Sequence, residues 1–251
     1  MSIRTVGIVG YGHFGKFIHE LCKRLAPDLT VKIYSRRGVV GEESFRSLAE
    51  VAACDVVMLC GAINEYEAQL LSVIDLAPQT TILVDVATVK SHTSQLLQRY
   101  ASDRLYLSTH PMFGPESYRK CNESVEGFRV VLCDHTLPEE QYHSVREHLT
   151  SLGFRVLEMT PDEHDQRLAE TLFLTHYVSQ SIVAGGFART DIDTASFGFL
   201  MDAVESVKHD TALFHDVYRF NPYCAVAVKR LHKAQEHVCS QLPDDVTKIY
   251  E

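Results

Sequence analysis

The chain has 251 residues, 45% of them hydrophobic and 23% charged, which is typical of a globular protein that buries a substantial core. Its 24 Lys and Arg against 33 Asp and Glu give a net charge of −9. This acidic balance argues against a nucleic-acid partner, because phosphate binding needs a basic face. The seven cysteines show neither a Cys-x-x-Cys pair nor a zinc-ligand spacing, so we predict no metal site.

The sequence shows no targeting or membrane signal. A polar Gly-rich turn begins at residue 10, which leaves no room for a signal peptide. No apolar run is long enough to cross a bilayer. We therefore expect a cytoplasmic protein with no membrane partner.

A Gly-rich turn follows the first predicted strand. Residues 5–9 are typical of a short buried strand, and apolar residues recur at helical spacing from Phe14 to Leu25. Strand, Gly-x-Gly-x-x-Gly and helix in this order predict a dinucleotide-binding turn. The first glycine permits the tight turn, the second lets the backbone approach a pyrophosphate, and the third lets the helix pack on the strand. The predicted cofactor-binding residues here are Gly10, Tyr11, Gly12, His13, Phe14 and Gly15.

The turn after the second predicted strand, residues 30–34, indicates which dinucleotide binds. In NAD-binding folds an acidic residue about 20 positions past the glycines binds the ribose 2′-hydroxyl, whereas an arginine accommodates a 2′-phosphate. Here the turn reads Ser35-Arg36-Arg37, without an acidic residue. We therefore predict NADP, with these three residues at the 2′-phosphate. The alternative is a solvated basic turn without a ligand.

The next elements predict a parallel sheet. Strands at 56–60, 81–86, 105–109, 127–134 and 154–160 alternate with helices at 45–53 and 65–77 and with one that a capping box, Thr136-x-x-Glu139, opens. This alternation predicts an α/β fold, a Rossmann-type doubly wound and mostly parallel sheet.

Open α/β sheets bind their ligands at the carboxyl edge of the strands. Gly61 and Ala62 follow the third predicted strand there, and we expect them to contact the cofactor. Thr88 and Lys90 follow the fourth strand, and the fifth delivers His110 to the same edge. Two alternatives remain open: Thr88 caps the next helix, and Lys90 is solvated.

The last third of the chain is predicted to be a separate helical domain. A second capping box, Thr160-Pro161-Asp162-Glu163, opens a region with helical periodicity only. We place the boundary near residues 157–161. The expected domains are an NADP-binding Rossmann domain, 1–158, and a small all-helical domain, 159–251, that closes on the substrate and forms a dimer.

The tract His110-Pro-Met-Phe-Gly-Pro-Glu116, together with the Gly-rich turn and Asp85-Val-Ala-Thr-Val-Lys90, resembles the prephenate/arogenate dehydrogenase family. The likeness is closest to plant-type arogenate dehydrogenases. It extends to Glu163-His-Asp165, Phe173-Leu-Thr-His176, Leu213-Phe and Asn221-Pro222. The resemblance implies NADP-dependent oxidative decarboxylation of a small molecule, arogenate or prephenate, in tyrosine biosynthesis.

The resemblance also implies residue roles. His110 matches the family's catalytic histidine, and a neutral imidazole is a natural acceptor for the hydroxyl proton of a carbinol. Thr88 stands where the family usually has serine, and would orient the imidazole or the substrate oxygen. His176 matches a second histidine that reaches the substrate from the helical domain. We assign no role to the remaining histidines outside the Gly-rich turn, His164 among them.

Glu205 is a departure from the bacterial pattern, in which an arginine grips the substrate side-chain carboxylate. A carboxylate at this substrate-binding position suits the ammonium group of arogenate better than the keto acid of prephenate. Lys208, Arg189 or Arg219 could replace the arginine, and the sequence does not choose among them.

Two other functions remain open. One is a related NADP dehydrogenase acting on another small carboxylate substrate. The other is a non-catalytic NADP-binding redox sensor, against which His110 beside Thr88 and Lys90 argues, because a sensor needs no proton acceptor. Helical second domains of this kind commonly pair across a two-fold axis, so we expect a homodimer.

Overall fold

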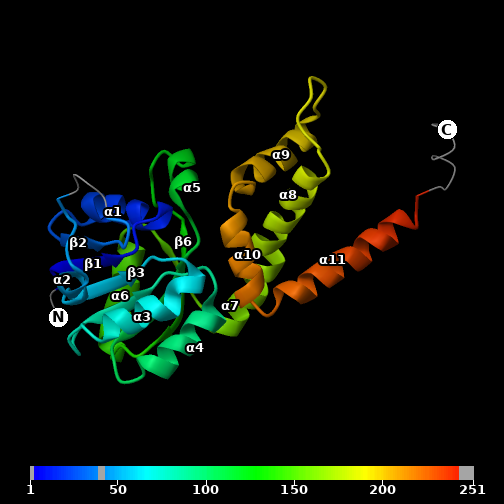
Figure 1. The fold of residues 1–251 in the computed structure, drawn as a ribbon. Coiled ribbons are helices and arrows are strands. Elements are labelled where there is room, and N and C mark those ends of the chain that lie inside the picture. The colour runs from blue at the N-terminus through cyan, green and yellow to red at the C-terminus, as the bar shows by residue number, and fades with distance from the viewer. Residues whose placement is uncertain (1–2, 39–42, 243–251) are drawn as a thin grey trace. The chain divides into compact units, whose positions relative to one another are not determined.

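The computed structural model describes residues 3–38 and 43–242, and the chain folds into two compact units, Met1–Asp165 and Gln166–Glu251 (Figure 1). Helix α7 (Pro161–Leu168) contains the division between them. The expected functional boundary at 158/159 stays a prediction.

The first unit is built on a seven-stranded sheet with the order β2-β1-β3-β4-β5-β6-β7. Neighbouring strands are parallel except β5 and β6, which are antiparallel. The strands are β1 Thr5–Val9, β2 Thr30–Tyr34, β3 Val56–Leu59, β4 Ile82–Asp85, β5 Tyr106–Pro111, β6 Arg129–His135 and β7 Arg155–Glu158. The strand order changes direction next to β1, where doubly wound sheets bind their ligands. The predicted Rossmann-type, mostly parallel sheet is confirmed.

Helices flank this sheet, with α1 and α5 beside each other and α3 beside α4 (Figure 1). They are α1 His13–Leu25, α2 Leu48–Ala52, the 3₁₀ turn η1 Ile63–Glu65, α3 Tyr66–Ile74, α4 Lys90–Tyr100, α5 Pro115–Lys120 and α6 Glu139–Ser151. Helix α2 is shorter than predicted, because Phe45 bridges to Ile33 as a strand residue and Ser47 forms a capping box with Glu50.

Of the two predicted capping boxes, one forms. Thr160 and Glu163 exchange backbone-to-side-chain hydrogen bonds at the start of α7. The box predicted at Thr136 is wrong. Its hydroxyl instead accepts from the amide of Tyr106 at 2.8 Å and donates to the carbonyl of Arg104 at 2.5 Å. This threonine therefore ties a loop to β5 rather than opening α6.

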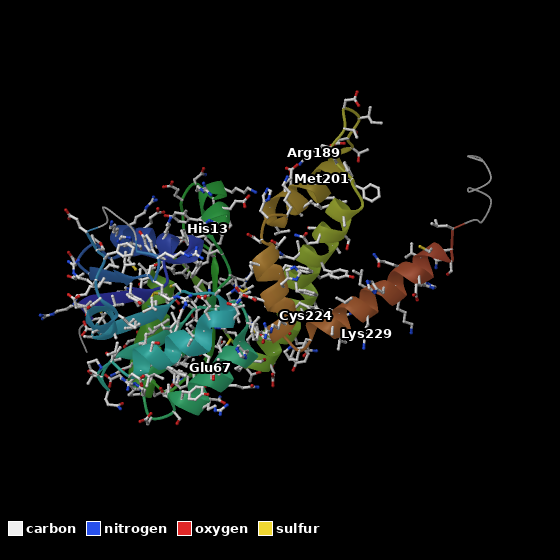
Figure 2. The ribbon with its side chains drawn as sticks, viewed as in Figure 1. His13, Glu67, Arg189, Met201, Cys224 and Lys229 are labelled. Carbon is white, nitrogen blue, oxygen red and sulfur yellow. The ribbon has the colours of Figure 1, made fainter. Side chains whose placement is uncertain are left out.

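The regular elements in the described residues of the second unit are all helices. After α7 come the π-helical turn η2 Ala169–Phe173, α8 Leu174–Ala184, α9 Ala195–Val207, α10 Thr211–Phe220 and α11 Cys224–Cys239. Met201 and Cys224, labelled in Figure 2, are buried in its core. Phe173 stacks on Phe214 there with ring centroids 5.5 Å apart. No helix in the described residues of either unit is long and apolar enough to cross a membrane.

Candidate functional site

The Gly-rich turn fits a dinucleotide. Gly10 has φ +98°, and a Cβ there would lie 2.9 Å from the amide nitrogen of Gly61. A Cβ at Gly15 would overlap the carbonyl oxygen of Gly10, so α1 packs directly on the turn. By contrast, nothing lies within 4 Å of a Cβ built on Gly12. The space is open at the N-terminus of α1, where unpaired N–H groups and the helix dipole favour a pyrophosphate.

The loops after β2 and β3 lie against this turn. Gly10 donates its N–H to the carbonyl of Tyr34 at 2.9 Å. Ser35, the next residue, therefore lies beside the Gly-rich turn. The contact between Gly10 and Gly61 places Ala62, which is exposed, next to it as well. The structure therefore brings together the three segments in which we predicted cofactor-binding residues.

Arg36 has a partner that the sequence did not predict. Its guanidinium forms an ion pair with Glu65 of η1, and both side chains are largely exposed. The turn itself has no acidic residue, but an acidic side chain reaches it in three dimensions, because Glu65 belongs to the 3₁₀ turn that follows β3, on the other side of β1 from β2. Arg37 is exposed to solvent at the same turn.

A closed polar network lies behind the carboxyl end of β4. The ammonium of Lys90 donates to Asp85 Oδ2 and to the carbonyl of Thr109, each at 2.6 Å. The same carboxylate oxygen accepts from Thr93 Oγ1 at 2.6 Å and from Ser108 Oγ at 3.1 Å. The side chains of Lys90 and Asp85 are both 0% exposed. Burying either charge alone would be costly, so each holds the other in place.

This arrangement bears on two predicted residues. In this conformation the side chain of Lys90 has no surface that a substrate could contact. Its burial fits neither the predicted substrate contact nor the alternative of a solvated lysine. Thr88 is half-buried in the loop between β4 and α4. Val89, not Thr88, is the N-cap of α4, so the alternative that Thr88 caps this helix does not hold.

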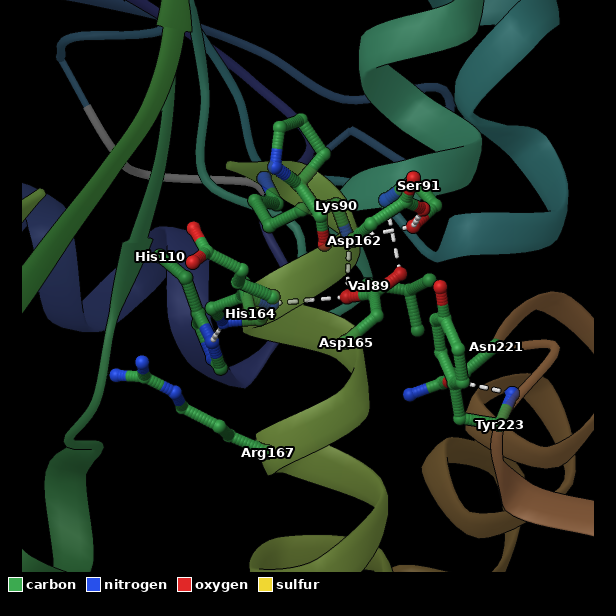
Figure 3. A network of polar contacts seen from close by, with 12 residues as sticks. Val89, Lys90, Ser91, His110, Asp162, His164, Asp165, Arg167, Asn221 and Tyr223 are labelled. Atoms are coloured by element: carbon green, nitrogen blue, oxygen red, sulfur yellow. Dashed lines mark hydrogen bonds and ion pairs between the residues drawn. The ribbon is translucent and has the colours of Figure 1, made fainter. Parts of the chain in front are cut away.

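His110 stands at the end of β5 and is 5% exposed. Its Nδ1 lies 2.9 Å from Nε2 of His164, and Nδ1 of His164 lies 2.8 Å from Oδ1 of Asp165 (Figure 3). The Asp165 carboxylate also accepts from the backbone amides of Lys90 and Ser91 at the start of α4, each at 2.8 Å. One buried chain of contacts thus runs from β5 through α7 to α4.

The surroundings of His110 favour the neutral form of its imidazole. Burial lowers the pKa of His110 well below its usual value of 6.5, with smaller contributions from His164 and the Lys90 ammonium. Its Nε2 makes no hydrogen bond within the described residues and is not among their fully buried unpaired nitrogens. His110 therefore has one ring nitrogen, Nε2, that no group in the described residues binds, and this nitrogen lies at the carboxyl edge of the sheet.

Sequence reasoning gave His164 and Asp165 no role, although both are in the tract Glu163-His-Asp165 that carries the family resemblance. The available signal was a histidine and an aspartate in adjacent positions directly after a capping box, in a helix otherwise rich in charged residues. Nothing local indicated that both would be buried.

The remaining predicted residues belong to the second unit. His176 is 4% exposed, burial lowers its pKa, and its Nδ1 has no hydrogen-bond partner in the described residues. Glu205 is exposed and accepts from Arg189 Nε at 2.9 Å. Arg189, labelled in Figure 2, also donates to Asp202 at 2.5 Å. Of the three cations considered as substitutes for the missing arginine, Arg189 is thus already paired with carboxylates, including that of Asp193 at 4.0 Å.

Comparisons with known proteins identify the family of this chain. The family model described as "Prephenate dehydrogenase, nucleotide-binding domain" matches residues 28–158. Two Arabidopsis thaliana proteins are similar. Arogenate dehydrogenase 1, chloroplastic, is 29% identical over 94% of this chain and 39% of its own length. Arogenate dehydrogenase 2, chloroplastic, is 27% identical over 96% of this chain and 70% of its own length.

Solved structures show the same fold. The prephenate dehydrogenase from A. aeolicus in complex with hydroxyphenyl propionate and NAD+ superposes with a TM-score of 0.75 at 20% sequence identity, over 96% of this chain and 91% of that one. The chain spans less than half the length of the first Arabidopsis relative. Since the family model covers more than half of this chain, including all six strands after β1, the protein belongs to the prephenate dehydrogenase family and carries its nucleotide-binding domain.

Proposed function

We propose that this protein is an NADP-dependent dehydrogenase that oxidatively decarboxylates arogenate, or prephenate, in tyrosine biosynthesis. The observation that carries the proposal is His110, a neutral imidazole at the carboxyl edge of a dinucleotide-binding sheet with one ring nitrogen held and the other open. Family membership and the names of the Arabidopsis relatives support the substrate class.

The residues at the sheet edge suit a bound cofactor. The amides at the start of α1 and the open space at Gly12 would hold the pyrophosphate. Gly61 and Ala62 would lie beside the same cofactor. A nicotinamide, when bound, supplies the hydride acceptor for the reaction. The pyrophosphate lies in the middle of such a cofactor, a ribose away from the reacting ring, so the Gly-rich turn is expected to affect affinity rather than chemistry.

His110 would act on the substrate hydroxyl. Hydride leaves the ring carbon that bears the 4-hydroxyl more easily as the O–H proton departs, and a neutral imidazole within hydrogen-bond reach accepts that proton. The ring carboxylate then leaves as CO₂ and the ring becomes aromatic. Thr88 would orient the imidazole or the substrate oxygen. His176, with its unpaired buried Nδ1, would contact the substrate from the helical unit.

The substrate side chain distinguishes arogenate from prephenate. Glu205 in place of an arginine favours the ammonium of arogenate over the keto group of prephenate. Its ion pair with Arg189 partly neutralises this carboxylate, which lessens the expected repulsion of prephenate. We therefore propose a preference for arogenate rather than an exclusion of prephenate.

Absorbance at 340 nm tests the reaction directly, with NADP⁺ or NAD⁺ and with each of the two substrates. We expect turnover with NADP⁺ and a higher kcat/KM for arogenate. A clear preference for prephenate would show that another cation grips the side chain. No turnover with either substrate would leave the related dehydrogenase acting on another carboxylate as the better proposal.

We propose that Ser35, Arg36 and Arg37 select NADP. A 2′-phosphate offers charge-assisted acceptors to guanidinium groups. Two such bonds, at about 1.5–3 kcal/mol each, give a preference of about 10²-fold once solvent screening is included. The double change Ser35→Asp and Arg36→Ala should invert it, since it also frees Glu65. As a control, Glu65→Gln should release Arg36 and strengthen NADP⁺ binding. Equal use of both cofactors by the unaltered protein would overturn this assignment.

The proposal includes a homodimer formed through the helical unit. This unit exposes several large apolar side chains, which a dimer interface could cover. They include Phe187, Ile192, Phe199, Val226 and Val238. Sedimentation equilibrium measures the mass in solution directly, and a monomer at micromolar concentration would contradict the proposal. The cytoplasmic location expected from the sequence remains part of it.

A further inference from the structure

The hydrogen positions in the hydrogen-bonded series His110–His164–Asp165 follow from the contacts of Asp165. The Asp165 carboxylate faces three nitrogens at 2.8 Å: the backbone amides of Lys90 and Ser91, which can only donate, and Nδ1 of His164. A carboxylate accepts hydrogen bonds and donates none. The Nδ1 of His164 must therefore carry a hydrogen and donate it to Asp165.

The tautomer of His110 follows from that of His164. A neutral imidazole has one donor and one acceptor nitrogen. When His164 is neutral and its hydrogen is on Nδ1, it presents the Nε2 lone pair to Nδ1 of His110, 2.9 Å away. A hydrogen bond at this distance then requires the hydrogen of His110 to lie on its Nδ1. The opposite tautomer of His110 would set two lone pairs against each other.

We propose that His164, itself held by Asp165, is a positioning residue that keeps His110 in the Nδ1–H tautomer, so that Nε2 is the nitrogen that accepts the substrate proton. This inference rests on the proposed role of His110. In the reaction the hydroxyl proton moves to Nε2, the O–H bond breaks, and an N–H bond forms. The resulting imidazolium keeps its Nδ1–H on His164.

Burial makes this constraint effective. The side chains of His164 and Asp165 are 3% and 0% exposed, so water does not compete for the hydrogen bonds between them. The rings of His110 and His164 lie with centroids 5.0 Å apart and planes at 72°. A carboxylate that fixes the tautomer and orientation of a catalytic imidazole is worth several orders of magnitude in rate in serine proteases. In this protein a second histidine, His164, lies between the carboxylate of Asp165 and the imidazole of His110.

The test combines kinetics with a direct observation of the tautomer. Protein labelled with ¹⁵N in histidine gives long-range ¹H–¹⁵N spectra that distinguish Nδ1–H from Nε2–H rings, and loss of signals in His110→Asn assigns those of His110. His164→Leu removes the acceptor at similar volume. His164→Gln retains a carbonyl oxygen that can accept from Nδ1 of His110. His143→Leu is the matched control, because His143 is exposed on α6 of the same unit.

We expect the Nδ1–H signature of His110 in the unaltered protein, its loss in His164→Leu, and its retention in His164→Gln and His143→Leu. We expect His164→Leu to lower kcat by about 10²-fold, within the range for lost general-base catalysis, with KM and NADP⁺ affinity little changed. His164→Gln should recover most of the activity. A purely structural role for His164 would not produce this pattern of tautomer and rescue.

Two results would overturn the proposal: an Nε2–H signature for His110 in the unaltered protein, or unchanged kcat and signature in His164→Leu. If His164→Leu does not fold, the comparison rests on His164→Gln, where wild-type kcat with an Nε2–H ring would overturn it equally. Wild-type kcat in His110→Asn is a different result. It would refute the proposed function while the spectrum still reports the tautomer.

Discussion

Two buried polar networks meet at the carboxyl edge of the sheet, and they differ in how completely their groups are paired. In the network of Asp85 and Lys90, the carboxylate and the ammonium are both enclosed and bonded to protein groups. In the network of His110, His164 and Asp165, one ring nitrogen stays open. A closed network stabilises a loop geometry, whereas an open position is available for chemistry. The two networks should therefore respond differently to mutation.

The largest expected effect is on activity, from the open network. His110→Asn removes the proton acceptor, and we expect kcat to fall by about 10²–10⁴-fold, the usual contribution of a general base. NADP⁺ affinity should stay nearly unchanged, because the phosphates are expected at the Gly-rich turn. Steady-state kinetics with a cofactor titration measures both quantities. Near wild-type kcat would remove His110 from the mechanism.

The next effect is on stability, from the closed network. Lys90→Met leaves the Asp85 carboxylate buried without its cation, and breaking a buried pair in this way costs about 3–5 kcal/mol of the free energy of unfolding. Urea denaturation measures the loss. Lys120→Met is the matched control, because Lys120 pairs with Glu116 on the exposed surface of α5, where a pair contributes at most about 1 kcal/mol. Equal losses in both variants would mean that Lys90 is not held as described.

A smaller loss of stability is expected from a change at the start of α7, the helix that contains His164 and Asp165. Thr160→Ala removes the hydroxyl that accepts from the amide of Glu163 at 3.2 Å. Loss of such a cap typically costs about 1 kcal/mol. Thermal unfolding should show a correspondingly lower midpoint, while Ser at this position should preserve it. A neutral Thr160→Ala change would indicate that packing alone fixes the start of α7.

The smallest expected effect is the change of kcat/KM with pH, which reports the neutral and protonated states of His110. The base is active when neutral, so activity is lost as pH falls through its pKa. Since burial holds the pKa of His110 well below 6.5, kcat/KM should change by less than about twofold between pH 7.5 and 6.5. A pH–rate profile with the preferred substrate checks this. A half-maximal point at or above 6.5 would show a solvated histidine or another controlling group.

The sequence predicted the parts of the site that depend on local pattern. Strand, Gly-rich turn and helix are contiguous, and the rule that ligands bind at the carboxyl edge placed His110 and Gly61 correctly on the fold. The partners of those residues were not predictable, because they come from distant segments. His164 meets His110 across 54 residues, and Glu65 meets Arg36 across 29.

Burial of charge was the other feature that local pattern could not show. Lys90 follows Asp85 by five residues, a spacing that indicates neither a shared helix face nor a strand face. The two residues pair because β4 ends at Asp85 and α4 begins at Lys90, so the short loop between these elements brings the two side chains together. At Thr136 the local pattern predicted a contact that does not form. The sequence matches a capping box, but the hydroxyl forms its hydrogen bonds with the backbone of Tyr106 and Arg104 instead.

The amide contacts of Asp165 have a consequence for the order in which the molecule assembles. Helix α4 begins without a side-chain cap of its own, and its first two amides bond to a carboxylate 75 and 74 residues further along the chain. During synthesis, α4 therefore leaves the ribosome long before its N-terminal partner exists. Closing so long a loop is entropically costly and slow compared with forming a helix. We expect the start of α4 to fray until α7 docks, so that the contact between His110 and His164 forms at that same late step of folding.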